Sequence, residues 1–373
     1  DSAAFLRQLT QELNFAAGVG RGAAEALQQR ADHAGDVRSP EIARLWLALA
    51  APAPRTWLLA GIKLDSGGWV TAEFDPARPA PLRVLRLRKE GAPEVWTAFR
   101  PANAPPRASL PAIESYQLTV DLANHLALDV GARLTLRAPA AVPGLLLRLD
   151  PDLHLVAAIG QTTGAAEWLQ PDGADWAYVA LPIAAGEATT INLRYHGSPP
   201  MAAAGDGGIV TGDWYPQLWE SLDPPPARWD LRFGPQRRYQ ILASPHQALP
   251  QAGFAAAPGQ TSTSTLPLAS GGRVSLTMLV PGDKKAQLLA PLAGARLLDI
   301  FNFLGARFGP YPYAAAGLWL DGPVGGVDPP VPGVVAFSGA DTSLPAAQAA
   351  ARPRWGAWTR PATADDVWLT QGL

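Results

Sequence analysis

Cysteine is missing from this sequence of 373 residues. Its absence excludes disulfide bonds, catalysis by a thiol and metal sites built on cysteine ligands. A chain without cysteine is compatible with the cytoplasm and with the periplasm or another extracytoplasmic space. The sequence therefore leaves the localisation open.

A strong net charge and a long apolar run are also missing. Lys and Arg number 30 against 32 Asp and Glu, which gives a formal net charge of −2. This balance favours neither a nucleic acid nor an anionic membrane surface as a partner. The longest uncharged stretch, Ile241–Gly272, is interrupted by prolines and rich in Ser and Thr. It predicts a loop-rich region, and we expect no transmembrane segment.

The histidines lack the spacing of metal ligands. No two of them lie three or four residues apart, so no pair shares a helical face. Scattered surface or strand histidines are the ordinary interpretation, and we expect no metal site built from them. The five are His33, His125, His154, His196 and His246.

The first hundred residues change character near residue 56. Residues 1–52 carry apolar stripes of helical period, such as Leu6, Leu9 and Leu13. A linker rich in Pro and Ala, Arg100–Pro111, follows the strand-like part. The strands expected between these two segments are Trp57–Lys63, Trp69–Phe74, Leu82–Arg88 and Val95–Phe99.

From about residue 113 the apolar residues alternate with polar ones, as in Tyr116, Leu118 and Val120. A period of two is typical of a half-buried strand, and many such strands separated by turns favour an antiparallel sandwich. After Pro281 the period becomes helical and runs to about Gly309. We therefore expect an α+β fold that is mostly β.

The most informative pattern lies at the end of the sequence, in Trp355–Gly356 (WG) and Trp368–Gly372 (WLTQG). It resembles the zinc-binding pattern of zinc aminopeptidases of the aminopeptidase N type, which are gluzincin metallopeptidases. In that family H-E-x-x-H-x-W-W-G precedes W-L-N-E-G at the same spacing. Gly309–Tyr313 (GPYPY) and Trp214–Leu218 (WYPQL) resemble further segments, the latter one common in bacterial members. The resemblance covers about residues 113–373.

The resemblance implies that every metal-binding position is replaced. Gln348 and Arg352 take the two histidine positions, Gln371 takes the third ligand position, and Ala349 takes that of the general base. Neutral amides are poor zinc ligands, and a permanently charged guanidinium repels the ion. Alanine accepts no proton from water. We expect no catalytic residue, no bound zinc and no other cofactor.

A peptide-binding strand is also implied by the resemblance. Gly325, Gly326 and Asp328 lie where the family has its G-x-M-E-N strand, which binds the substrate backbone and its amino group. The expected partner is therefore a peptide or the terminus of another protein. Pro329 and Pro330 depart from the family pattern and remove backbone donors. An alternative role for this region is purely structural, with Arg352 paired to a nearby aspartate.

These patterns divide the chain into an N-terminal extension (1–112), an aminopeptidase N-like sandwich domain (113–268) and a partial thermolysin-like domain (269–373). In the family, helical structure continues beyond this point. We therefore expect a missing C-terminal region or a partner chain to cover the last helix. The function expected is that of a pseudopeptidase, a peptide- or protein-binding or scaffolding module. The alternative is a metallopeptidase-family hydrolase with rearranged ligands, or one completed by missing C-terminal residues.

Overall fold

The structure is a computed structural model that describes four early strands and then residues 111–337, apart from short gaps. The gaps are residues 163, 220–225, 236–237, 281, 283, 321 and 323–330. The helices expected over residues 1–52 and nearly all of the linker expected at 100–111 lie outside the described residues.

The four early strands form an antiparallel sheet in the order β1-β2-β3-β4. All four strands expected in this part of the sequence are confirmed to within one residue at either end. Their bounds are β1 (Leu58–Lys63), β2 (Trp69–Phe74), β3 (Leu82–Leu87) and β4 (Glu94–Phe99).

The largest sheet has seven strands in the order β18-β16-β5-β6-β12-β8-β9. Its strands are β5 (Ala112–Leu122), β6 (Leu128–Arg137), β8 (Leu153–Gly160), β9 (Gly164–Ala165), β12 (Ala188–Gly197), β16 (Ala227–Phe233) and β18 (Ala248–Leu249). The expected alternation is confirmed in β5, where Leu118 and Val120 are buried and Gln117 and Thr119 are exposed. One face of this sheet therefore supplies core and the other meets solvent.

A four-stranded sheet, β10-β11-β7-β15, shares its core with the buried face of the seven-stranded sheet. Its strands are β7 (Leu145–Arg148), β10 (Trp168–Leu169), β11 (Trp176–Val179) and β15 (Gln217–Leu218). The sandwich is mostly antiparallel, as expected, but β16 pairs with β5 in parallel. This pairing follows from the long excursion of the chain between the two strands, which returns β16 to the sheet in the same direction as β5.

Two more sheets complete the described part of the chain. The first, β13-β14-β19-β17, is called the third sheet because it follows the two sheets of the sandwich, and the second, β20-β21-β22-β23, is called the small sheet. The stretch Ile241–Gly272 is not loop-rich as expected, because most of it forms strands. Pro245, Pro250 and Pro258 each lie just after a strand end, where no ladder hydrogen bond is lost. The strands are β13 (Met201–Ala204), β14 (Gly207–Val210), β17 (Gln240–Ala243), β19 (Phe254–Ala257), β20 (Gln260–Pro267), β21 (Arg273–Val280), β22 (Ala315–Leu320) and β23 (Val334–Phe337).

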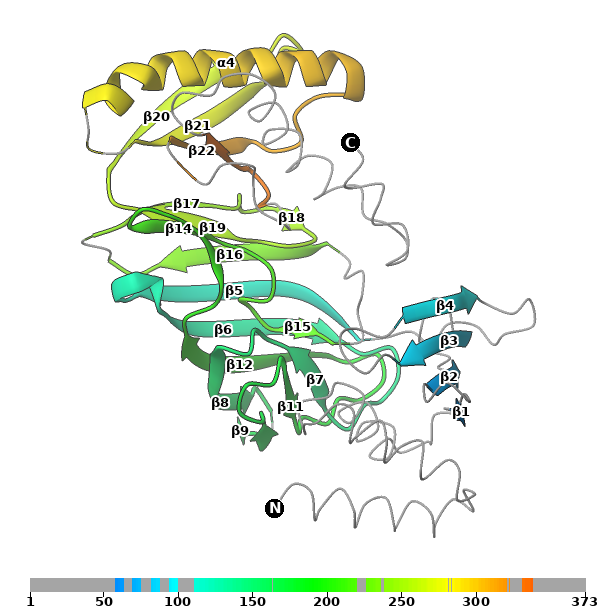
Figure 1. The fold of residues 1–373 in the computed structure, drawn as a ribbon. Helices are drawn as coiled ribbons and strands as arrows, with labels where there is room; N and C mark the ends of the chain where they lie inside the picture. The colour runs from blue at the N-terminus through cyan, green and yellow to red at the C-terminus, as the bar shows by residue number, and fades with distance from the viewer. Residues whose placement is uncertain are drawn as a thin grey trace.

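The small sheet lies between a helix and the third sheet (Figure 1). The helix α4 (Lys284–Phe308) buries Leu297 and Phe301 against it, and Gly309 ends the helix with φ of 89°. On the other face Trp319 of β22 joins a buried cluster that includes Leu242 of β17. The expected helix and both expected strands, Leu318–Leu320 and Val334–Phe337, are confirmed.

Helix α4 is long and apolar enough, by length and composition alone, to cross a membrane, with a mean hydropathy of 1.4 within Ala286–Phe308. Core helices have the same composition, and here one side of the helix is packed on the small sheet. The expected boundary between residues 268 and 269 falls between β20 and β21, which pair with each other. The division into three domains stays a prediction.

Candidate functional site

The four positions at which a replaced zinc site is expected, Gln348, Ala349, Arg352 and Gln371, lie outside the described residues. The expected peptide-binding residues Gly325, Gly326 and Asp328 also lie outside them. The structure does describe the strands on either side of this second group. The chain leaves β22 at Leu320 and enters β23 at Val334, and the two strands run in parallel.

The GPYPY segment holds the end of α4 against the small sheet. Tyr311 stacks on Phe301 of the helix with ring centroids 4.0 Å apart, and Tyr313 meets Tyr311 edge to face at 5.2 Å. Both tyrosines are buried. Stacked and edge-to-face rings contribute beyond the area they bury, so the segment fixes how the chain leaves the helix and enters β22. This motif therefore serves packing.

The side chains at the expected metal positions are two amides and a guanidinium, which are poor zinc ligands, and the expectation that they replace a zinc site stays a prediction. Within the described ranges, no group of three or more His, Asp or Glu side chains is arranged to hold a metal ion. Sheet pairing does bring His154 of β8 opposite His196 of β12, with ring centroids 6.3 Å apart. Helical spacing rules could not find this pair, since the residues meet across two strands.

The WYPQL segment occupies the core of the sandwich. Trp214 is fully buried, and its Nε1 donates a hydrogen bond to the carbonyl of Ala252 at 2.9 Å. Tyr215 packs edge to face against Tyr116 and Trp229, with centroids 5.4 and 4.7 Å away. A buried indole needs such a partner for its N–H, and here the backbone supplies it. These aromatic side chains are part of the core.

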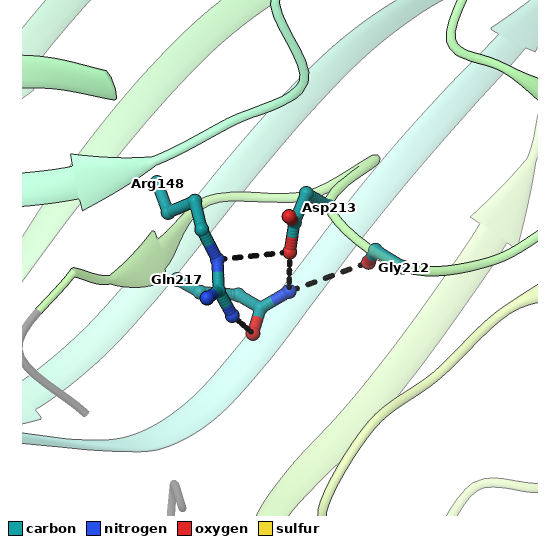
Figure 2. A network of polar contacts seen from close by, with 4 residues as sticks. All are labelled: Arg148, Gly212, Asp213 and Gln217. Atoms are coloured by element: carbon teal, nitrogen blue, oxygen red, sulfur yellow. Dashed lines mark hydrogen bonds and ion pairs between the residues drawn. The ribbon is translucent and has the colours of Figure 1, made fainter. Parts of the chain in front are cut away.

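Gln217, in the same segment, takes part in a polar network with Arg148, Asp213 and the carbonyl of Gly212 (Figure 2). The Arg148 guanidinium donates to Gln217 Oε1 at 3.0 Å, and its Nε lies 3.0 Å from Asp213 Oδ1. The Gln217 amide donates to Asp213 Oδ1 at 2.9 Å and to the Gly212 carbonyl at 3.3 Å. The Asp213 carboxylate balances the positive charge of Arg148, and both the oxygen and the nitrogen of the Gln217 amide form hydrogen bonds.

Asp150 lies beside this network, and its backbone N–H donates to the carbonyl of Asp213 at 2.9 Å. Burial raises the pKa of the Asp150 carboxyl above its ordinary value, and the carboxylates of Asp152 and Asp213 act in the same direction. The backbone N–H of Asp152 donates to Asp150 Oδ1 at 2.9 Å and opposes the shift. Because its polar groups bind one another, the network ties β7 to the WYPQL segment and presents no reactive group.

Sequence reasoning missed this network because its members come from separate parts of the chain. Arg148 and Gln217 are 69 residues apart and meet only because β15 pairs with β7. The one available hint was Asp213 directly before the WYPQL segment, since a charged residue beside a buried aromatic pair needs a partner.

Solved structures with a similar fold include several M1 zinc metallopeptidases. A two-domain M1 zinc metallopeptidase, a Glu-to-Ala variant bound to L-tryptophan, is 16% identical with a TM-score of 0.55, covering 70% of this chain and 68% of that one. The L-arginine complex of such a variant is 17% identical with a TM-score of 0.55, and the match covers 72% of this chain and 70% of that one. A variant from Deinococcus radiodurans bound to a Tyr-Ser-Ala substrate is 18% identical with a TM-score of 0.53, and the match covers 70% of this chain and 68% of that one.

The chain has the fold of the M1 zinc metallopeptidases. At 16 to 18% identity the likeness concerns the fold alone, and a fold does not define an activity. No protein-family model matches the sequence, and a search of curated proteins gave no match. The mostly β architecture expected from the sequence is confirmed, and the expected resemblance is supported at the level of the fold.

Proposed function

We propose that this chain is a non-catalytic relative of the M1 zinc aminopeptidases and acts as a peptide- or protein-binding or scaffolding module. The observation that carries the proposal is the combination of this fold with the residues at the replaced metal positions. Gln348, Arg352 and Gln371 provide no imidazole and no carboxylate, and Ala349 provides no base. A peptidase of this class needs both, so hydrolysis is not expected.

Peptide binding itself does not require zinc. A peptide that adds as a strand pairs through its backbone, and the segment with Gly325, Gly326 and Asp328 leads from β22 toward β23. Asp328 offers a carboxylate to a free amino group, and Arg352 offers a positive charge where the metal position would be. The occupant that fits both is a short peptide or the terminus of another protein.

The alternative is a metallopeptidase with rearranged ligands or with activity completed by a region beyond this sequence. Metal content separates the two proposals. After dialysis against micromolar zinc, we expect the purified full chain to retain no stoichiometric zinc by elemental analysis. One equivalent retained, and lost on Gln371→Ala, would favour the alternative and end the first proposal.

Turnover and peptide binding give an independent test. Fluorogenic aminoacyl substrates are expected to show no chelator-sensitive release at high protein concentration. Calorimetric titration with short peptides is expected to detect weak binding that Asp328→Ala and Arg352→Gln each reduce. If peptides at millimolar concentration do not bind, or bind equally well to both variants, only a scaffolding role is left.

A further inference from the structure

The solvent-facing side of the seven-stranded sheet carries a groove of about 280 Å3 that is unrelated to the peptidase-like positions. Four adjacent strands, β16, β5, β6 and β12, supply its walls through side chains on the polar face of the sheet. Its volume is just below the roughly 300 Å3 at which pockets for drug-sized ligands begin, so its occupant is a small molecule or one group of a larger one. The polar side chains that line it are Gln117, Thr119, Arg133, Asn192, Asp230 and Arg232.

The groove exists because of Gly131 in the middle of β6. The residue is opposite Thr119 on one side and Arg194 on the other, and an ideal Cβ at this position meets nothing within 4 Å. Its backbone does not need glycine, since its φ is not positive. Glycine weakens a strand interior and often marks a place where a ligand approaches the backbone. Neither turn geometry nor crowding explains this glycine.

Arg133 is the charged group that this groove leaves available. It lies in one row across the sheet with Gln117 of β5 on one side and Asn192 of β12 on the other. Within the described part of the chain, its guanidinium has no hydrogen bond and no ion pair. An amide–guanidinium–amide row presents donors on three neighbouring strands, and a guanidinium binds a carboxylate through two parallel hydrogen bonds.

The other charges of the lining are already paired, since Arg232 forms a 2.6 Å ion pair with Asp230. Arg194 lies opposite Gly131 but outside the lining, and it forms a 2.8 Å ion pair with Asp129. Each pair carries no net charge. The lining therefore holds two arginines and one aspartate, which leaves one positive charge, that of Arg133. One carboxylate matches this charge.

We propose that this groove binds the carboxylate of a small organic acid. Arg133 is the principal ligand, the amides of Gln117 and Asn192 donate to the carboxylate oxygens, and the gap at Gly131 takes the carbon chain. The site is independent of the proposed peptide binding, because its residues lie outside both the zinc-type positions (348–371) and the expected peptide-binding segment (325–328).

Calorimetric titration of the full chain with succinate tests the proposal, with neutral succinamide as the uncharged match. Saturable binding of succinate in the millimolar range is expected, and none of succinamide. An N-acetylated dipeptide with a free carboxyl terminus distinguishes a free organic acid from a peptide carboxylate. The free acid is expected to bind at least about tenfold more tightly, because the groove is too small for a backbone as well. If neither carboxylate saturates, or if succinamide binds as well as succinate, the proposal is wrong.

Two variants locate the site. Arg133→Gln is expected to weaken succinate binding at least about tenfold, since a hydrogen bond to a charged group is lost. The matched control is Arg228→Gln. Arg228 lies on β16, is exposed on the same face of the sheet as the groove, and does not line the groove. Equal loss in the two variants would indicate general electrostatics and overturn the proposal.

Gly131→Val adds a Cβ that meets nothing within 4 Å, and valine suits a strand. It is expected to abolish binding while leaving the melting temperature unchanged or higher. That combination excludes misfolding as the cause. Retained binding in Gly131→Val would contradict the proposed position of the ligand.

Discussion

The seven-stranded sheet and the small sheet bury their residues in different ways. In the first, strands such as β5 bury every second side chain and leave the polar partners in water. In the second, β22 (Ala315–Leu320) buries five of its six residues in an unbroken run. Parallel pairing with β21 and β23 and coverage on both faces account for the difference.

The two sheets are stabilised by different neighbours. The core that contains Trp214 and Trp229 is one cluster that runs from the sandwich into the small sheet and α4, where Leu318 and Leu297 belong to it. The small sheet is covered by α4 on one face and by the β14, β17 and β19 sheet on the other. Its edge strand β20 is nearly all exposed and rich in Ser and Thr.

The largest effect is expected from Trp229→Ala in the sandwich. The Trp229 ring stacks on Tyr116 at 4.0 Å, and its Nε1 donates to the Leu249 carbonyl at 2.9 Å. Truncation leaves a cavity and an orphaned carbonyl, so the free energy of unfolding should fall by about 3–5 kcal/mol. Denaturant unfolding measures this, with Trp168→Ala on the exposed edge as the control. A comparable loss in both variants would contradict the assignment of Trp229 to the buried core.

A smaller effect is expected from Leu242→Ala where the small sheet meets the third sheet. Leu242 of β17 approaches Gly317 of β22 so closely that an added Cβ there would lie 3.0 Å from it. The loss should be about 2–4 kcal/mol. Leu288→Ala is the control, because Leu288 is 81% exposed on α4.

The unfolding transition of Leu242→Ala tests whether the small sheet unfolds together with the sandwich. If the small sheet depends on the sandwich, unfolding should stay a single transition with an earlier midpoint. Hydrogen exchange that rises only in β21–β23, with the sandwich unaffected, would instead identify the small sheet as a unit that opens by itself.

The smallest effect is expected from Asp150→Asn beside the network of Arg148, and it depends on pH. Burial raises the folded-state pKa of Asp150 above its value in the unfolded chain. At a pH between these two pKa values, the folded chain keeps a proton that the unfolded chain has released. The wild type should therefore lose stability as the pH rises from about 4 through the folded-state pKa, whereas the Asn variant should not. The stability of the variant relative to the wild type should thus increase from acid to neutral pH.

Denaturant unfolding at several pH values measures this difference. Asp172→Asn at an exposed position is the matched control and should show no such trend. A relative stability that is flat with pH would show that the Asp150 carboxyl does not titrate differently in the folded and unfolded chains.

The sequence motifs differ in what the structure shows of them. GPYPY and WYPQL both serve packing, through Tyr311 on Phe301 and Trp214 in the sandwich core. The zinc-type positions from Gln348 to Gln371 lie outside the described residues, so their role stays a prediction.

Local periodicity predicted strands such as β5 and the long helix α4, because it decides which side chains of an element can be buried together, whereas the strands within Ile241–Gly272 were not predicted. Alternation in β5 and the helical stripe of α4 are such local properties. Which strands lie side by side is a property of the tertiary structure. It places β16 parallel to β5, joins Arg148 to Gln217, and opens a groove above Gly131 beside Arg133. These arrangements depend on pairing between strands far apart in the chain, and the alternation within one strand does not specify its partner.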